Sequence, residues 1–412
     1  MGSSFNMVKK PKKDVNDFDD DETEDIDLDD DISSSKKRRS YDDDDNKSKM
    51  FKLMGVIIVI TVVLLLVLWI ASLVGGSKAT YEDVEVLMAD AAKGYFSNHQ
   101  EYLPKNDGEI VEVGVANLVE EGYMKDLSKY FGEGVCTGTV QVENAGGDYL
   151  YTPYLNCGDQ YTTVELFRKI IEDNPPVTEG NGLYEANGAY VFRGENINNY
   201  VKLDKSLWRI VKIVNDGNVV LIRNEGIINS KPWDNRFNET KNYEAGVNNY
   251  NVSRIKDYLA NVYKNQVEFD NEKILSAKDR TRIVSFDVCV GKRSPDSQSK
   301  NNTEECRQKA QNQKLGLLTL SDYLFASIDN GCRSANTKSC TNYNYLSQYD
   351  DEWWLSTAST ENDFEVYKVD RWGIVQIDTA STYSQVRPVI YLNSKAMFKS
   401  GRGTEKSPYK VK

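Results

Sequence analysis

The sequence predicts a mixed α+β protein that is anchored in a membrane. An uncharged apolar run extends from Leu53 to Val74, and all six cysteines lie after it. In the second half of the chain, strand patterns are followed by helix patterns and then by strand patterns again. Segregated strands and helices of this kind are typical of α+β domains rather than of alternating parallel sheets.

The composition limits what the chain can bind. A length of 412 residues predicts two or three domains, and a formal net charge of -12 leaves no electrostatic footprint for nucleic acid. Residues 1–50 are rich in charge blocks such as DDDETEDIDLDDD and poor in large apolar side chains. Such a segment cannot bury enough surface to offset its ordering entropy, so we expect a disordered acidic and basic tail. Two alternatives are a solvated tail without a ligand and a docking or phosphorylation segment around KKRR.

The run from Leu53 to Val74 predicts one transmembrane helix. At 1.5 Å per residue such a helix spans about 33 Å, which exceeds a hydrocarbon core of about 30 Å. The run is longer than the apolar region of a secretory signal peptide. Several lysines precede it closely, and the first charge after it is Lys78. The positive-inside rule therefore predicts a single-pass protein of the cell membrane, with a cytoplasmic N-terminus and extracellular C-terminal domains.

The cysteines predict disulfide bonds. An even number confined to the exported part of a chain is typical of an oxidising compartment. Many pairings are open to six cysteines, but proximity in the sequence favours 136–157, 289–306 and 332–340. Zinc is the competing interpretation, but the chain has no Cys-x-x-Cys and its one histidine, His99, is far from any cysteine in the sequence. The cysteines are Cys136, Cys157, Cys289, Cys306, Cys332 and Cys340.

Residues 78–174 are expected to form a small extracellular α+β domain. Apolar residues recur at helical spacing over 81–95, and a second short helix is expected over 115–121. Alternating residues on both sides of the glycines at 146–147 predict a hairpin whose two arms the first disulfide would join. The layout of membrane helix, amphipathic helix and hairpin resembles the head of a pilin-like subunit.

A Pro-, Gly- and Asn-rich linker over 175–183 is expected to precede the large domain, residues 184–412. Two apolar runs around Asp216-Gly217 predict a hairpin in the middle of a covered sheet. Helices are expected over VSRIKDYLANVYKN and LTLSDYLFASI, the second with Ser321 as its N-cap. The strand EWWLST, the hairpin FEVYKVDRWGIVQID and the strand VRPVIYLN follow.

The pair Trp353-Trp354 lies within EWWLST. Neighbouring side chains of a strand point to opposite faces of the sheet, so the two rings cannot form one stacking platform for a ligand. Each ring can bury about 150–250 Å². We therefore expect core packing, with ligand contact as the alternative.

The closing segments also resemble a known fold family. The order WWLST, VYKVDRWGIV and VRPVIYL resembles the last strands of the C-type-lectin-like superfold, which formylglycine-generating-enzyme-like proteins share. A nearer resemblance is to an uncharacterised domain of exported proteins from low-GC Gram-positive bacteria. It covers about residues 184–411 and is carried by YVFRGENINNYVKLDKSLWRIVKI, GLLTLSDYLFAS and GRGTEKSPYKV. The resemblance implies a C-type-lectin-like domain but fixes no function.

The chain departs from the better-known members of that superfold at their functional motifs. Calcium-dependent lectins use a Glu-Pro-Asn loop and a Trp-Asn-Asp strand, and neither occurs here. The catalytic cysteine pair of formylglycine-generating enzymes lies near the end of that fold, whereas no cysteine follows Cys340. We therefore expect no cofactor and no metal, and calcium binding has no motif to support it.

The usual catalytic constellations are also missing from the sequence. With His99 as the one histidine, no Ser–His or Cys–His arrangement fits the large domain. No phosphate-binding Gly-rich loop is present. Carboxylates are plentiful, with 63 Asp and Glu, so no glycosidase pair can be selected. We leave enzymatic activity open and favour a non-catalytic protein.

Two polar and aromatic stretches are the candidate binding surfaces. In the resembling fold, ligands are met near the closing strands, which suggests a turn and the polar stretch DTASTYSQ after it. The alternative is an ordinary solvated hairpin turn. The second stretch is KPWDNRFNET, where the tryptophan could instead pack under its own loop. The candidate residues are Trp233, Asp234, Arg236, Arg371, Trp372, Asp378, Tyr383 and Gln385.

These observations together predict a membrane-anchored bacterial surface protein that presents an extracellular recognition module. The expected partners are the membrane and a glycan, a cell-wall polymer or a surface protein. One alternative is a cell-wall-modifying hydrolase, which requires two carboxylates about 5–9.5 Å apart in a cleft. The other is a pilin-like structural subunit, which requires an apolar patch for self-association.

Overall fold

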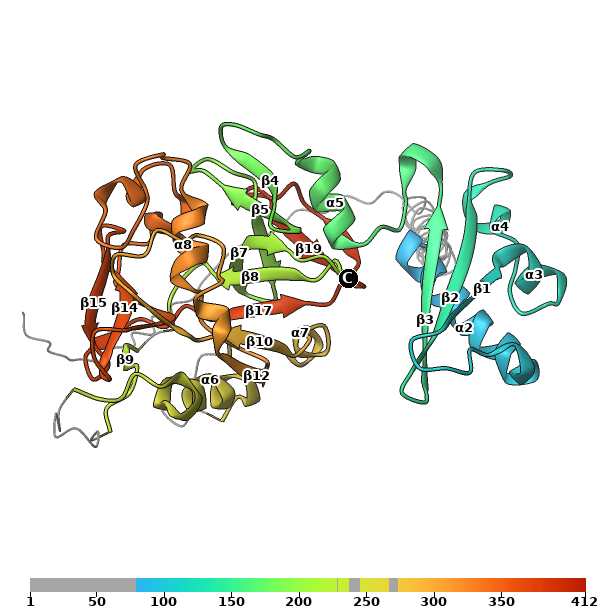
Figure 1. The fold of residues 1–412 in the computed structure, drawn as a ribbon. Coiled ribbons are helices and arrows are strands. Elements are labelled where there is room, and N and C mark those ends of the chain that lie inside the picture. Colours follow the sequence, from blue (N-terminus) through green and yellow to red (C-terminus); the bar gives the residue numbers. More distant parts are fainter. Residues whose placement is uncertain (1–78, 228, 237–244, 267–272) are drawn as a thin grey trace, which may run out of the picture. The chain divides into compact units, whose positions relative to one another are not determined.

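The computed structural model describes residues 79–412, except residue 228 and the segments 237–244 and 267–272. The described residues contain helices, several β-sheets and two hydrophobic cores, so the predicted mixed α+β class is confirmed (Figure 1). The predicted tail (1–50) and transmembrane helix (53–74) lie outside them. Within the described ranges, no helix is long and apolar enough to cross a membrane.

The first core lies between helix α2 (Tyr81–Asn98) and a three-stranded sheet. Thr80 and Asp83 form a capping box that fixes the start of α2. The face of α2 that includes Val84 and Met88 is fully buried, as its helical spacing predicts. The other elements around this core are η1 (Gln100–Tyr102), β1 (Ile110–Gly114), α3 (Val115–Glu120), α4 (Ser128–Phe131), β2 (Thr137–Ala145), β3 (Asp148–Asn156) and η2 (Gly158–Gln160).

The hairpin of β2 and β3 turns at Gly146 and Gly147, both of which have positive φ. This left-handed conformation favours glycine, so the pair closes the turn without strain. The disulfide Cys136–Cys157 joins the open end of the hairpin, where Thr137 pairs with Asn156. The predicted pairs Cys289–Cys306 and Cys332–Cys340 are also present, so the disulfide assignment is confirmed.

The second core begins at α5 (Leu166–Asp173), whose Leu166 and Ile170 are fully buried in it. Its largest sheet has eight strands. The order is β17-β8-β7-β6-β19-β18, and β5 joins β4 to β7. These strands are β4 (Gly182–Ala186), β5 (Ala189–Arg193), β6 (Tyr200–Leu203), β7 (Ser206–Ile213), β8 (Val219–Arg223), β17 (Val389–Leu392), β18 (Phe398–Ser400) and β19 (Tyr409–Val411).

Strands β7 and β8 form the predicted hairpin around Asp216-Gly217, and every residue of β8 is buried. Both faces of β8 are therefore covered, as its continuous apolar run predicts. The first residue of β17 is Val389, so the predicted strand VRPVIYLN is shorter than its pattern. Pro388 precedes this strand, and a proline has no amide N–H to donate to a ladder.

A four-stranded sheet in the order β11-β13-β14-β15 and two small sheets, β10-β12 and β9-β16, complete the second core. Figure 1 shows β14 and β15, coloured red, at the end of this body remote from β19. The remaining elements are β9 (Lys231–Pro232), η3 (Tyr250–Val252), α6 (Arg254–Lys264), α7 (Ala277–Thr281), β10 (Phe286–Cys289), β11 (Lys292–Arg293), η4 (Glu305–Arg307), β12 (Lys309–Gln313), α8 (Leu320–Ala326), η5 (Lys338–Thr341), η6 (Tyr345–Gln348), β13 (Trp353–Ser359), β14 (Glu365–Val369), β15 (Val375–Thr379) and β16 (Tyr383–Ser384).

The two tryptophans of β13 are both fully buried and have different neighbours. Trp353 contacts Tyr323 edge to face at 5.9 Å, and the guanidinium of Arg387 lies 4.6 Å from its ring centroid. Trp354 donates its Nε1–H to the carbonyl oxygen of Lys231 at 2.7 Å. The expectation of core packing is therefore confirmed.

Helix α8 starts differently from the prediction. Its N-cap is Thr319, whose side chain accepts the amide N–H of Asp322 at 3.1 Å, so the assignment of Ser321 as N-cap was wrong. Ser321 lies inside the helix and its Oγ donates to the carboxylate of Glu305 at 2.9 Å. Serine and threonine both cap helices, so Thr319 and Ser321 were each possible N-caps. Ser321 is excluded because its hydroxyl is bonded to the buried Glu305 carboxylate.

A buried ion pair lies beside this helix. Arg293 Nη1 is 3.2 Å from Glu305 Oε1, and the two side chains are 1% and 0% exposed. Arg293 also donates to the carbonyl oxygens of Ser297 and Ser299, at 3.0 and 2.6 Å. The pair thereby fastens the start of the 294–306 loop to its end.

Candidate functional site

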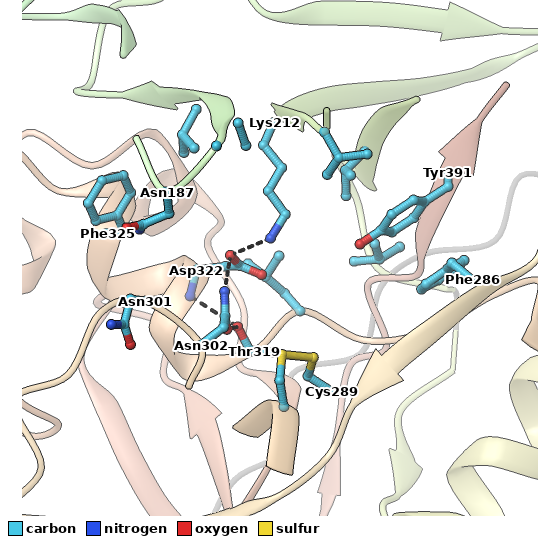
Figure 2. Close-up of a pocket in the computed structure, with 18 of the residues that line it drawn as sticks. Asn187, Lys212, Phe286, Cys289, Asn301, Asn302, Thr319, Asp322, Phe325 and Tyr391 are labelled. Carbon is cyan, nitrogen blue, oxygen red and sulfur yellow. Dashed lines mark hydrogen bonds and ion pairs between the residues drawn. A yellow bond between two sulfur atoms is a disulfide. The ribbon is translucent and has the colours of Figure 1, made fainter. Parts of the chain in front are cut away.

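The second core carries a cavity of about 520 Å³, which is within the usual range of small-ligand sites. Segments far apart in the sequence form its wall: the β4–β5 turn, the β7–β8 hairpin, β10, the 300–306 loop, the start of α8, and β17. Figure 2 shows polar side chains across the middle of the cavity, with Tyr391 and Phe286 at one end and Asn187 and Phe325 at the other.

A hydrogen-bonded chain of four side chains forms the middle of the cavity (Figure 2). Lys212 Nζ lies 2.8 Å from Asp322 Oδ1, and Asn302 Nδ2 donates to the same oxygen at 2.8 Å. Thr319 Oγ1 donates to Asn302 Oδ1 at 2.5 Å. The chain joins β7, the disulfide-closed loop and α8, so it fixes the direction of each polar group before any ligand arrives.

The charge of Lys212 is stabilised at this place. Burial alone would lower its pKa, but the charge and the hydrogen bond of Asp322 outweigh burial and raise the pKa above the ordinary 10.5. Lys212 and Asp322 are 17% and 14% exposed, so water screens the pair only partly. The cavity therefore holds a fixed ammonium–carboxylate pair at neutral pH.

This shift predicts a pH dependence of stability. Because the pKa of Lys212 is higher in the folded chain, its contribution is fully present below about pH 10.5 and is lost as the pH rises through the folded pKa. The gap in free energy of unfolding between the wild type and Lys212→Met should thus be constant near neutrality and shrink above about pH 10.5. Urea unfolding over a pH series measures the gap. Lys309→Met, a change at an exposed lysine, is the control. A gap that widens above that pH would contradict the assignment.

The aromatic end of the cavity consists of Phe286 and Tyr391. Their rings stack at a centroid distance of 4.1 Å and an interplanar angle of 15°. Burial raises the pKa of the Tyr391 hydroxyl, which stays protonated and can donate a hydrogen bond at neutral pH. Two carboxylates also line the cavity. Asp216 accepts a hydrogen bond from Asn218 Nδ2, and Asp287 accepts one from the amide N–H of Asn312.

The opposite end is built on a tight turn. Ala186 pairs with Ala189, and the two residues between them, Asn187 and Gly188, both have positive φ, as a type I′ hairpin requires. The turn places Asn187 at the same end of the cavity as Phe325 (Figure 2). Asn301 lies at this end as well (Figure 2), and Lys300, its neighbour in the chain, also lines the cavity.

The candidate stretch KPWDNRFNET has a structural role where it is described. Trp233 is fully buried and donates its Nε1–H to the carbonyl oxygen of Leu355 at 3.0 Å, so it packs under its own loop. Asp234 is fully buried as well. Its Oδ2 accepts three hydrogen bonds, from Arg236 Nε at 2.9 Å, from Arg236 Nη2 at 2.7 Å and from the amide N–H of Arg254 at 3.0 Å. In the described part of this stretch, Asn235 is exposed and the Arg236 side chain is 37% exposed.

The candidates of the closing strands are divided between two places. Arg371 and Trp372 lie in the β14–β15 turn, where Trp372 is 69% exposed. Asp378 lies at the far end of β15 and pairs with Lys368 at 2.6 Å. Tyr383 is 61% exposed, whereas Gln385 is engaged with its neighbours: its carbonyl oxygen accepts the amide N–H of Trp354.

The pairing of β9 with β16 brings the two candidate stretches together, because Tyr383 lies opposite Pro232. None of the eight candidate residues lines the cavity. Sequence reasoning missed Lys212, Asn302 and Asp322, which lie in three separate elements. One signal was available: a lysine inside an otherwise apolar strand requires a buried partner. The Asn187-Gly188 dipeptide between two strands was another.

The comparisons with known proteins add no relative: no family model, curated protein or solved structure matches the chain. In the part of the chain that the structure describes, no three His, Cys, Asp or Glu side chains gather as a metal site would require. What the cavity offers is hydrogen bonding and aromatic contact.

Proposed function

We propose that the chain is a membrane-anchored surface protein whose large domain is a recognition module for saccharides, and that the 520 Å³ cavity is the binding site. The observation that carries the proposal is that the cavity lining offers a ligand both hydrogen bonds and aromatic contact. The hydrogen bonds come from the Lys212–Asp322–Asn302 chain, and the aromatic contact comes from the Phe286–Tyr391 stack. The proposal also includes two expectations from the sequence: that the large domain has the C-type-lectin-like fold, and that a transmembrane helix anchors the chain.

The chemistry of the wall suits a sugar. Hydroxyl groups both donate and accept, and the chain presents an ammonium and an amide as donors and a carboxylate and an amide oxygen as acceptors. The apolar C–H face of a pyranose packs on aromatic rings, which supply contact area with a polar edge. Polar groups that are already held in place lower the entropy cost of binding.

A glycan and cell-wall-fragment array with the full-length chain tests the proposal, run once with calcium and once with a chelator. Asn187→Gly removes a cavity side chain and keeps a residue that tolerates positive φ. Phe286→Ala removes one ring of the stack. Each variant should weaken binding about tenfold or more, since a loss of 1.4 kcal/mol corresponds to a factor of ten.

Trp372→Ala and Tyr383→Ala are the matched controls, because they remove exposed aromatic rings outside the cavity. Both should bind like the wild type. Binding that is lost in these variants but kept in Asn187→Gly and Phe286→Ala would move the site to the closing strands. If the folded chain binds no glycan or wall fragment in either buffer, the proposal fails.

A further inference from the structure

Lys300 differs from the other charged groups of the cavity. It lies on the loop that the Cys289–Cys306 disulfide closes, its side chain is half-buried, and it lines the cavity. Within the described residues, no hydrogen bond or ion pair engages its ammonium group, whereas Lys212 in the same cavity is paired with Asp322. A half-buried ammonium without a partner has lost part of its hydration and has nothing to replace it.

The neighbours of Lys300 do not supply the missing negative charge. Burial lowers the pKa of Lys300, the positive charge of Arg193 and that of Arg333 lower it further, and Asp329 is the one nearby carboxylate that opposes them. Arg193 and Arg333 therefore add positive charge near Lys300, and Asp329 offsets part of it. Asp329 is itself engaged, because its Oδ2 accepts a hydrogen bond from Asn342 at 2.7 Å.

Arg193 connects this charge to the wall of the cavity. Its guanidinium lies 4.5 Å from the ring centroid of Phe325, which lines the cavity, and 4.7 Å from that of Tyr184. It donates to the carbonyl oxygens of Phe325 and Ser327, both at 2.8 Å, and these neutral partners leave its charge uncompensated. Asp287 follows Phe286 in β10, at the aromatic end of the cavity. Near Phe325, positive charge therefore remains that no ion pair offsets among the described residues.

From this unpaired ammonium in the lining we infer that the saccharide bound in the cavity is acidic, and that Lys300 holds its carboxylate or phosphate group. The inference rests on the proposed function, because it concerns the ligand of that same cavity. A ligand anion would replace the lost hydration of the Lys300 ammonium, with Arg193 and Arg333 adding favourable charge behind it. Its ring would extend toward Asp322 and the Phe286–Tyr391 stack.

Isothermal titration calorimetry with matched sugars tests the inference on the full-length chain. Glucuronate and its uncharged amide have nearly the same shape, and glucose 6-phosphate against glucose separates phosphate from carboxylate recognition. We expect at least one acid to bind about tenfold more tightly than its neutral counterpart, which corresponds to about 1.4 kcal/mol. The preference should shrink as salt is added, because part of the attraction is screened.

Lys300→Gln is the decisive variant, and Lys309→Gln, at an exposed lysine of β12, is its control. In Lys300→Gln, acidic and neutral sugars should bind about equally, and the affinity for neutral sugars should be that of the wild type. Lys309→Gln should leave the preference for the acid unchanged. Equal binding of acidic and neutral sugars, or a preference that survives Lys300→Gln, would overturn the inference and leave the proposed function standing. If neither acidic nor neutral sugars bind, the proposed function itself fails.

Discussion

Replacing Glu305 by alanine is expected to lower the free energy of unfolding by about 3–5 kcal/mol. The change leaves the Arg293 guanidinium, 1% exposed, without its carboxylate. It also removes the acceptor of the Ser321 hydroxyl and amide N–H, at 2.9 and 3.0 Å. Burying an uncompensated charge is among the largest single costs in a folded protein. Urea unfolding of the wild type and the variant measures the loss.

Two further variants separate the charge from the packing. Glu305→Gln keeps an acceptor for Ser321 but removes the negative charge, so it should lose most of the same stability. The double change Arg293→Met with Glu305→Leu removes both charges and should recover a large part of it, since apolar pairs often replace buried ion pairs without loss. Glu361→Ala, at an exposed carboxylate, is the control and should stay within about 0.5 kcal/mol of the wild type. A Glu305→Ala variant as stable as this control would contradict the assignment.

Trp353→Ala is expected to cost about 3–5 kcal/mol of stability, whereas Trp372→Ala should change it by no more than about 0.5 kcal/mol. Trp353 is fully buried against Tyr323 and Arg387, and Trp372 is 69% exposed. The substitution is chemically the same in both, so the difference measures burial. Removal of Trp353 leaves a cavity between the Tyr323 ring and the Arg387 guanidinium, and that guanidinium loses one of its two aromatic contacts, the other being with Tyr349.

Thermal and urea unfolding of both variants, followed by circular dichroism, give this comparison. Trp353→Phe should be intermediate, because a smaller ring fills part of the space. Trp354→Phe should lower the stability through the smaller ring and also through the loss of one hydrogen bond, since Trp354 Nε1 donates to the Lys231 carbonyl oxygen at 2.7 Å. Equal stability of Trp353→Ala and Trp372→Ala would contradict the burial argument.

Elements that depend on local sequence were predicted well. The amphipathic spacing of 81–95 gave α2, the Gly146-Gly147 pair gave the β2–β3 hairpin, and Asp216-Gly217 gave that of β7 and β8. Their signals lie within a few residues of each other, because helical spacing and turn conformation depend on neighbouring side chains. The error at the start of α8 had a long-range cause: the carboxylate that occupies Ser321 belongs to Glu305, sixteen positions earlier.

The sequence by itself therefore determined the fold class, the hairpins, the three disulfides and the burial of the tryptophan pair. The tertiary structure alone decided where a cavity lies and which charges remain without partners. Lys212, Asn302 and Asp322 come together only because β7, the disulfide-closed loop and α8 pack against one another. No local pattern encodes such a meeting, since Lys212 and Asp322 are 110 positions apart in the chain. The polar and aromatic stretches near the closing strands drew attention in the sequence, whereas the polar residues of the cavity lie in separate elements that only the fold brings together.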